Sequence, residues 1–206
     1  MNKRNKTSVS SAMIEKKTAQ WRKKWLEEFE FGKNYDVKKR EMAATYATKR
    51  GKESFNYSLN GYPVEPFCSE IVLEALQSQP ILPAKIERLE DITIGIGAGI
   101  SMQGEFCGAI LGHIIGIGID VAFRKRETAI IRKEISIATR NFCRIFKKKF
   151  GAVRCEDLTQ TSFLKENGII DQNALKIFRE GDPPKSLKCQ NIIRFCVYAP
   201  FPSEEI

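Results

Sequence analysis

The sequence is poor in several residue types and patterns that common functions require. Its 206 residues include one histidine and two tryptophans, and none of its six cysteines forms a Cys-x-x-Cys pair. A Ser–His–Asp catalytic set is not credible, because the single histidine, His113, lies in an apolar stretch and is expected to be a core residue. Zinc sites with paired cysteines two to four residues apart are disfavoured as well.

Long apolar segments are also lacking. The first residues are positively charged, but no apolar stretch follows them, so we expect no secretory signal. The most apolar run, 106–119, has 14 residues and is bounded by Glu105 and Asp120. A membrane-spanning helix needs about 20 apolar residues. We therefore expect this run to be a buried core helix of a soluble, cytoplasmic protein without a membrane span, with Glu105 capping its start.

The positive charge is concentrated at the N-terminus. Residues 1–50 hold 14 Lys plus Arg against 6 Asp plus Glu, and the rest of the chain holds 20 against 19. Within 13–31, Trp21, Trp25 and Phe29 recur every four residues, which predicts an amphipathic helix with one aromatic face. We expect residues 1–35 to be a basic helical extension that docks its aromatics on a domain formed by residues 36–206. A nucleic-acid role is the weaker interpretation, since a charge run alone is weak evidence.

Hydrophobic spacing predicts helices through the remaining chain. No internal repeat and no alternating strand pattern is present, so the expected fold class is all-α, a helical bundle. The expected helices are 37–57, a short one after Pro66, one from Ala84 that breaks at Gly95, Gly97 and Gly99, one from Glu105, 126–150, a turn at 155–158, 172–179 and 188–198. The glycines at 95–99 are set aside as a dinucleotide motif, because position 100 is isoleucine and no parallel sheet is expected.

Four of the six cysteines lie at or near the starts of predicted helices. They are Cys68, Cys107, Cys155 and Cys189. Helix N-termini lower a thiol's pKa and favour the thiolate, which is the form that binds metal or attacks disulfides. Disulfides are not expected to persist in a reducing compartment. The other two, Cys143 and Cys196, are expected to be core residues.

A glycine recurs every fourth residue around Cys107. Gly104, Gly108, Gly112 and Gly116 form this stripe, and each interior glycine costs a helix up to about 1 kcal/mol relative to alanine. A stripe without side chains lets another backbone or an inorganic cluster approach, and Gly104 and Gly108 are the candidate cofactor contacts. Tight helix packing explains Gly112 and Gly116 equally well.

The order of these elements resembles a known family. Cys68, the Cys-Gly-Ala-x-x-Gly element that begins at Cys107, the segment leading to Cys155, and Cys189 are similar to the redox-active protein family named for its C…CGAxxG…C…C pattern. The resemblance implies a helical fold in which the four cysteines are the functional residues. A similar domain accompanies an iron–sulfur centre in split-Soret cytochromes. This chain lacks their Cys-x-x-Cys-His haem motif, and its single histidine excludes bis-histidine haem binding.

The donor set narrows the cofactor. Four thiolates are the usual ligands of [2Fe–2S] and [4Fe–4S] clusters and of structural zinc. Gaps of 39, 48 and 34 residues separate the four cysteines, so each ligand comes from a different element of a finished fold. We favour an iron–sulfur cluster over zinc, with the protein acting in electron transfer or redox sensing.

Two other functions remain open. A metal-free thiol–disulfide oxidoreductase would cycle two of the cysteines, and whether the protein is an enzyme is therefore not decided. A redox-sensitive nucleic-acid-binding module that uses the basic N-terminal segment ranks last. The sequence identifies neither the redox partner nor the oligomeric state, a homodimer included.

Overall fold

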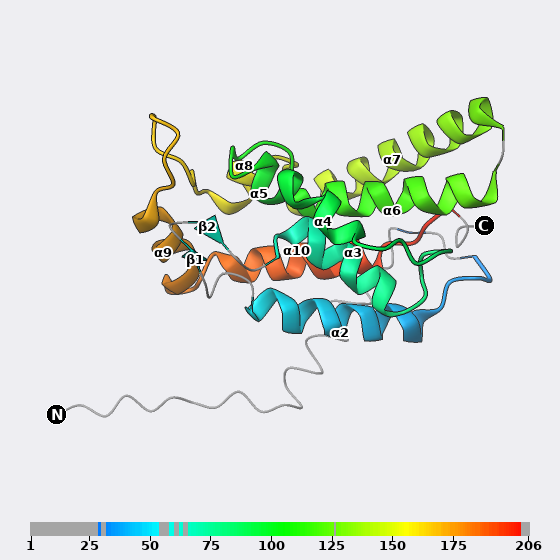
Figure 1. Cartoon of the computed structure of the whole chain (residues 1–206), viewed down its shortest axis with the longest axis horizontal. Coiled ribbons are helices and arrows are strands. Elements are labelled where there is room, and N and C mark those ends of the chain that lie inside the picture. Colours follow the sequence, from blue (N-terminus) through cyan, green and yellow to red (C-terminus); the bar gives the residue numbers. More distant parts are fainter. Residues whose placement is uncertain are drawn as a thin grey trace. The chain divides into compact units, whose positions relative to one another are not determined.

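The computed structural model describes residue 29 and residues 32–53, 58–59, 62–63, 66–125 and 127–202 (Figure 1). This part of the chain is all-α, as predicted, apart from one hairpin of two strands with two residues each. Its helical elements are α2 (Val37–Glu53), α3 (Cys68–Ser78), α4 (Leu89–Ile92), η1 (Ile94–Ile96), α5 (Gly97–Ile100), α6 (Gly108–Arg124), α7 (Thr128–Phe150), α8 (Cys155–Thr159), α9 (Gln172–Glu180) and α10 (Ser186–Tyr198). The hairpin pairs β1 (Ser58–Leu59) with β2 (Tyr62–Pro63) in antiparallel register.

Some sequence predictions lie outside the described residues. These are the helix expected at 13–31, except for Phe29, and the last residues, 54–57, of the helix expected at 37–57. The boundary between an extension at 1–35 and a domain at 36–206 therefore stays a prediction. None of the described helices combines the length and the apolarity needed to cross a bilayer.

Helix α3 is the centre of the bundle. It packs against α2, α6 and α10, and Figure 1 shows it between them. Its apolar residues are buried because these neighbours cover nearly its whole circumference; Ile71, Val72, Leu73, Ala75 and Leu76 are all fully buried. The first turn of α3 is capped by Glu70, whose carboxylate accepts the Phe67 backbone N–H at 2.7 Å.

The glycine stripe of α6 brings this helix close to α3. A Cβ atom at Gly112 would lie 2.8 Å from the carbonyl oxygen of Ser69, and one at Gly116 would lie 2.6 Å from Phe201. Contacts this short leave no room for a methyl group. Packing against α3 therefore accounts for Gly112, whereas Gly116 makes room for Phe201, which follows the end of α10.

A buried cation joins α2 to α10. Arg40 has no exposed surface, and its Nη1 donates to the carbonyl oxygen of Val197 at 2.7 Å. Its guanidinium group lies 4.6 Å from the ring centroid of Phe201. Because Val197 lies in the last turn of α10, the positive charge faces the negative end of that helix dipole. The sequence pattern gave no signal for this contact.

Helix α7 has the bounds expected from its spacing, but it is less buried than predicted. Its helical spacing predicts six inward residues, which are Ile131, Ile135, Ala138, Phe142, Ile145 and Phe146. Only Phe142 and Phe146 are buried, and the other four are partly exposed. The helix ends where Gly151 adopts φ 86°, as expected for a glycine C-cap.

One predicted helix is wrong. The segment from Ala84 was expected to be a single helix, but residues 84–88 form no helix, and α4, η1 and α5 are short separate pieces. The physical reason is that Arg88 and residues 98–102 adopt left-handed backbone conformations, which interrupt a right-handed helix. The core helix also begins at Gly108 rather than at Glu105.

The glycine packing generates a stability prediction with an internal control. Gly112→Ala should lower the free energy of unfolding by about 1–3 kcal/mol, because the new methyl group overlaps Ser69 and Val72 of α3. Gly118→Ala, in the same helix with nothing within 4 Å, should raise it by up to about 1 kcal/mol through helix propensity. Urea denaturation followed by circular dichroism measures both. Equal effects of the two substitutions would contradict this account of the stripe.

Candidate functional site

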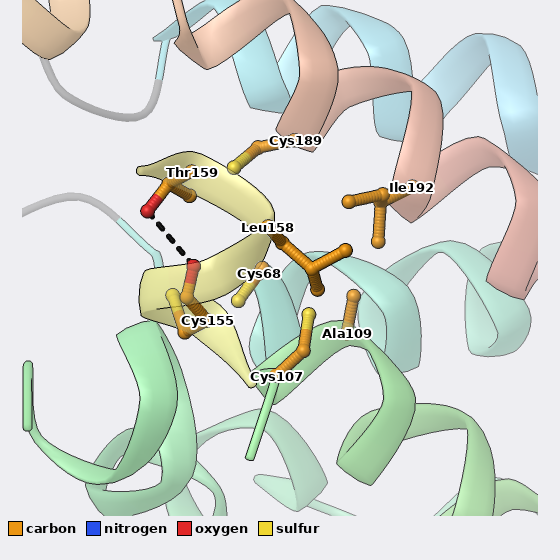
Figure 2. A pocket seen from close by; sticks show the side chains of 8 residues that line it. All are labelled: Cys68, Cys107, Ala109, Cys155, Leu158, Thr159, Cys189 and Ile192. Atoms are coloured by element: carbon orange, nitrogen blue, oxygen red, sulfur yellow. Dashed lines mark hydrogen bonds between the residues drawn. The ribbon is translucent and has the colours of Figure 1, made fainter. Parts of the chain in front are cut away.

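One pocket brings together the four cysteines that the sequence singled out. It is lined by Cys68, Cys107, Ala109, Cys155, Leu158, Thr159, Cys189 and Ile192 (Figure 2), and its cavity volume is about 20 Å³, which is room for little more than one water molecule. The cysteines come from α3, α6, α8 and α10 or the residues that start these helices. None of the six cysteines is in a disulfide.

Each pocket cysteine lies in the first turn of a helix or at its cap, which confirms the predicted placement. Cys68 and Cys155 are the first residues of α3 and α8, Cys107 is the N-cap of α6, and Cys189 is the fourth residue of α10. For Cys68 this position brings the sulfur within hydrogen-bond reach of the backbone N–H groups of Ser69, Ala98 and Ala109.

Backbone pairing fixes Cys107 relative to Cys155. The Cys107 N–H donates to the carbonyl oxygen of Val153 at 2.9 Å, and the Cys155 N–H donates to that of Glu105 at 2.6 Å. Phe106 and Arg154 form an antiparallel bridge between these two bonds. The side chain of Glu105 lies 3.4 Å from Arg154 and half exposed, so the expected capping role of Glu105 is wrong.

A left-handed segment, residues 98–102, packs beside Cys155 without lining the pocket itself. Ala98, Gly99, Ile100, Ser101 and Met102 have φ values of 49°, 73°, 62°, 50° and 70°. This conformation costs roughly 1–2 kcal/mol for each residue with a side chain, and strain of this kind concentrates at functional sites. The sequence analysis missed the segment, although its three nearby glycines marked an interrupted helix.

Two glycines allow the backbone to reach the cysteines. A Cβ atom at Gly99 would lie 2.6 Å from the Cβ of Cys155, and one at Gly108 would lie 2.8 Å from the Sγ of Cys68. Gly104, at φ 75°, instead faces the side chain of Glu156. Neither Gly104 nor Gly108 lines the pocket itself. Their assignment as cofactor contacts stays a prediction.

The environment separates Cys68 from the other pocket thiols. A hydrogen bond from the Cys107 thiol, with further ones from the backbone N–H groups of Ala98, Ser69 and Ala109, lowers the pKa of Cys68 to about 7 in spite of burial. The same bond, together with burial, raises the pKa of Cys107.

The remaining two pocket thiols are held in the neutral form. Burial raises the pKa of Cys155 to about 12 and that of Cys189 well above its usual value. The nearby sulfur of Cys68 raises both pKa values further, because a second negative charge in an apolar pocket is unfavourable. Near neutral pH and without a metal, Cys68 is therefore the one pocket thiol that is expected to titrate, while the other three stay protonated.

The other candidate residues lie away from the pocket. Cys196 is fully buried, as predicted for a core cysteine, but Cys143 is only partly buried. His113 is a core residue, with its ring centroid 4.1 Å from that of Phe142. Neither of its ring nitrogens makes a well-formed hydrogen bond within the described part of the chain. Burial lowers the pKa of His113 to about 3, so the ring is neutral.

The pocket has the right donors for a metal cluster but no ready-made site for one ion. Four cysteine sulfurs surround it, and this is the ligand set of both zinc and iron–sulfur centres. Among the described residues, however, no group of three or more His, Cys, Asp or Glu side chains is arranged to hold a metal ion. The assignment of Cys68, Cys107, Cys155 and Cys189 as metal ligands stays a prediction.

Comparison with protein families supports the resemblance noted in the sequence. A family model described as "Putative redox-active protein (C_GCAxxG_C_C)" matches residues 67–199, more than half of the chain and a range that includes all four pocket cysteines. In this chain the central element has the order Cys107-Gly108-Ala109-Ile110-Leu111-Gly112. Neither the curated proteins nor the solved structures gave a match.

The left-handed segment generates a second stability prediction. Ile100→Gly should raise the free energy of unfolding by about 1 kcal/mol, because glycine adopts φ 62° without the clash that a β-branched side chain suffers. Ile94→Gly is the matched control, since Ile94 is similarly exposed (48% against 44%) but has an ordinary φ. It should be destabilising. The midpoint of urea unfolding measures both effects. A lower midpoint for both variants would contradict the prediction that Ile100→Gly is stabilising.

The Cys68 environment generates a prediction of pH-dependent reactivity. In the reduced, metal-free protein the alkylation rate of Cys68 should reach half its maximum near pH 7, because the lowered pKa makes the thiolate available there. Iodoacetamide labelling with peptide mass spectrometry measures this rate. Cys143, whose pKa burial raises, serves as the internal control and should react only at higher pH. Cys107→Ala should shift the Cys68 profile towards higher pH, and an unchanged profile would contradict the assigned hydrogen bond.

Proposed function

This chain belongs to the redox-active C_GCAxxG_C_C family, and from that premise we propose that its four pocket cysteines carry the redox function by binding an iron–sulfur cluster. The observation that carries the proposal is that thiols from four separate helical elements, 34 to 48 residues apart in sequence, line a single pocket. Four thiolates complete the coordination of a [2Fe–2S] or a [4Fe–4S] cluster.

The wide separation of the four cysteines in sequence favours an iron–sulfur cluster over zinc, because structural zinc sites usually take cysteines in pairs two to four residues apart. A tetrahedral zinc site holds four sulfur atoms about 2.3 Å from one point. The described residues offer no such arrangement around one ion. A cluster supplies iron and sulfide of its own between the protein's thiolates, so its ligands can stand further apart. Zinc is therefore the weaker candidate for this pocket.

The residues around the pocket suit such a group. Leu158, Ile192 and Ala109 give it apolar walls that exclude water, while backbone N–H groups at Cys68 donate to sulfur. Hydrogen bonds to sulfur and restricted solvent access are the means by which a protein sets the potential of a cluster. When bound, the cluster supplies a one-electron couple.

The raised thiol pKa values imply that metal loading releases protons. Cys155, Cys107 and Cys189 are neutral thiols at pH 7 in the metal-free chain, and they have to lose their protons to become ligands. Loading should therefore be tighter at higher pH. The buried thiols also stay inert towards oxidants until a metal or a base removes the proton.

One observation favours a second candidate function. Cys68 and Cys107 are hydrogen-bonded neighbours, and this bond lowers the pKa of Cys68 to about 7 while it raises that of Cys107. Such a pair can act as a dithiol that loses two electrons and two protons when it forms a disulfide, with a disulfide substrate gaining both. In that function Cys155 and Cys189 are dispensable.

Anaerobic purification tests the cluster proposal. The untreated protein should be brown and contain iron and acid-labile sulfide in comparable amounts. Cys→Ser substitution at any one of Cys68, Cys107, Cys155 or Cys189 should lower the iron content by about tenfold or more, since outer-shell changes alone cost 10–100-fold in metal affinity. Cys143→Ser is the control, because this half-buried residue does not line the pocket.

Two results would contradict the proposal. Iron-free, colourless protein from an iron-replete anaerobic preparation would exclude the cluster. If, in addition, only Cys68→Ser and Cys107→Ser abolished reduction of a small disulfide such as oxidised glutathione, the dithiol function would replace it.

A further inference from the structure

Helix α7 presents a row of exposed basic side chains. Lys133, Arg140, Arg144 and Lys147 follow one another at intervals of seven, four and three residues, and all four are exposed. At 100° per residue these intervals place the four within about 60° of one another around the helix. They extend over roughly 21 Å of its length, at 1.5 Å per residue. We call these four side chains the α7 basic face.

No acidic side chain neutralises this face within the described residues. The single acidic residue of α7 is Glu134, which faces Arg124 at 3.5 Å and Lys125 at 4.0 Å on the side of α6. None of the four basic residues forms an ion pair with a carboxylate in the described part of the chain. A uniform positive potential along 21 Å attracts an anionic partner.

The basic face ends in the last turn of α7, from which the chain leads to Cys155. Lys147 lies in the last turn of α7, and the chain reaches Cys155 after only a short link whose Val153 accepts the Cys107 N–H. Figure 1 shows this end of α7 next to α8, whereas the other end extends away from the pocket beside α6. A protein that docks along the face therefore reaches the end of the helix from which the chain leads to Cys155.

We propose that the α7 basic face is the docking surface for an acidic one-electron carrier protein. The inference rests on the proposed cluster function, because it supplies the partner that such a cluster needs. In one turnover the carrier loses one electron and the oxidised cluster gains it, and no other reactant takes part. Charge complementarity brings the carrier to the end of the helix that leads to the pocket.

The composition of the face favours a protein over other polyanions. Ile130 and Ile137, which are 44% and 42% exposed, lie on the same side of α7 as the basic residues. Protein interfaces combine such apolar contacts with a charged rim. Binding of single-stranded nucleic acid relies on aromatic side chains that stack on bases, and Phe142 and Phe146 of α7 are instead buried.

A membrane surface fits less well. A helix that lies on a bilayer inserts an apolar side among the lipids. The apolar side of α7 packs instead on the bundle, where Phe146 contacts Phe195 of α10 at a ring distance of 5.9 Å and the helix packs against α6.

Charge reversal on the full-length protein tests the proposal. The variant Lys133→Glu, Arg140→Glu, Arg144→Glu, Lys147→Glu should weaken binding to an acidic plant-type [2Fe–2S] ferredoxin by at least about tenfold at low ionic strength. The matched control replaces four other exposed lysines, Lys38, Lys85, Lys165 and Lys176, by Glu and so changes the net charge equally. It should weaken binding by less than about threefold, since exposed charges far from an interface are screened.

Isothermal titration calorimetry with oxidised ferredoxin measures the binding affinity, and it does so whether or not an electron is transferred. Equal weakening by both variants would overturn the proposal, because the effect would then be one of net charge. Absence of ferredoxin binding to the unmodified protein would overturn it as well. A third arm uses a 20-base-pair DNA duplex and phosphatidylserine vesicles. If the charge-reversal variant lost binding to the DNA or to the vesicles but still bound ferredoxin, the α7 basic face would be assigned to nucleic acid or membrane. That result would overturn the proposal of a carrier protein.

The iron content of the same samples keeps the two proposals separate. If the protein contains iron and sulfide but does not bind ferredoxin, only the docking proposal is contradicted. If the protein binds ferredoxin through the α7 basic face but contains no iron, the cluster proposal is contradicted and the docking surface is retained.

Discussion

The close approach of α3 and α6 is the constraint on which the cysteine pocket depends. Gly108 and Gly112 remove side chains from the face of α6 that meets α3, and the backbone of Ser69 occupies the space. The same approach places the sulfur of Cys68 directly against Gly108, one residue from Cys107. A wider separation of the two helices would part these sulfurs, because α3 and α6 each carry one of them at the start.

The other half of the pocket is held by backbone rather than by side chains. The bonds between Cys107 and Val153 and between Cys155 and Glu105 fix α8 against the start of α6. The left-handed segment 98–102 then fits between Cys155 and the chain before α6 only because Gly99 has no Cβ. Local strain in this segment is balanced by the packing of Met102, which is buried beside Phe163 and Cys155.

Burial gives the pocket its chemistry. In water the four thiols would be equivalent, but apolar surroundings raise three of the pKa values and hydrogen bonds lower that of Cys68. An assembly of this kind resists the accumulation of negative charge unless a cation or a cluster shares it. The family relationship and the electrostatics thus favour the same class of function, a redox centre built on cysteine sulfur.

The sequence alone determined the elements whose signals are local. A short helix was expected after Pro66, where α3 begins at Cys68, and the helix expected at 126–150 corresponds to α7. The sequence also identified the four cysteines and their positions near helix starts, because these signals depend only on single residues and their neighbours in sequence.

Only the tertiary structure decided which of these residues meet. Three features depend on contacts between residues far apart in sequence. They are the hydrogen bond between Cys107 and Cys68, the hydrogen bond from Arg40 to α10, and the partial exposure of Ile131. The left-handed conformation of Ile100 is a further case, since an isoleucine has no local preference for it. Periodicity indicates which residues seek burial, but the partner that buries them is chosen by packing of the whole chain.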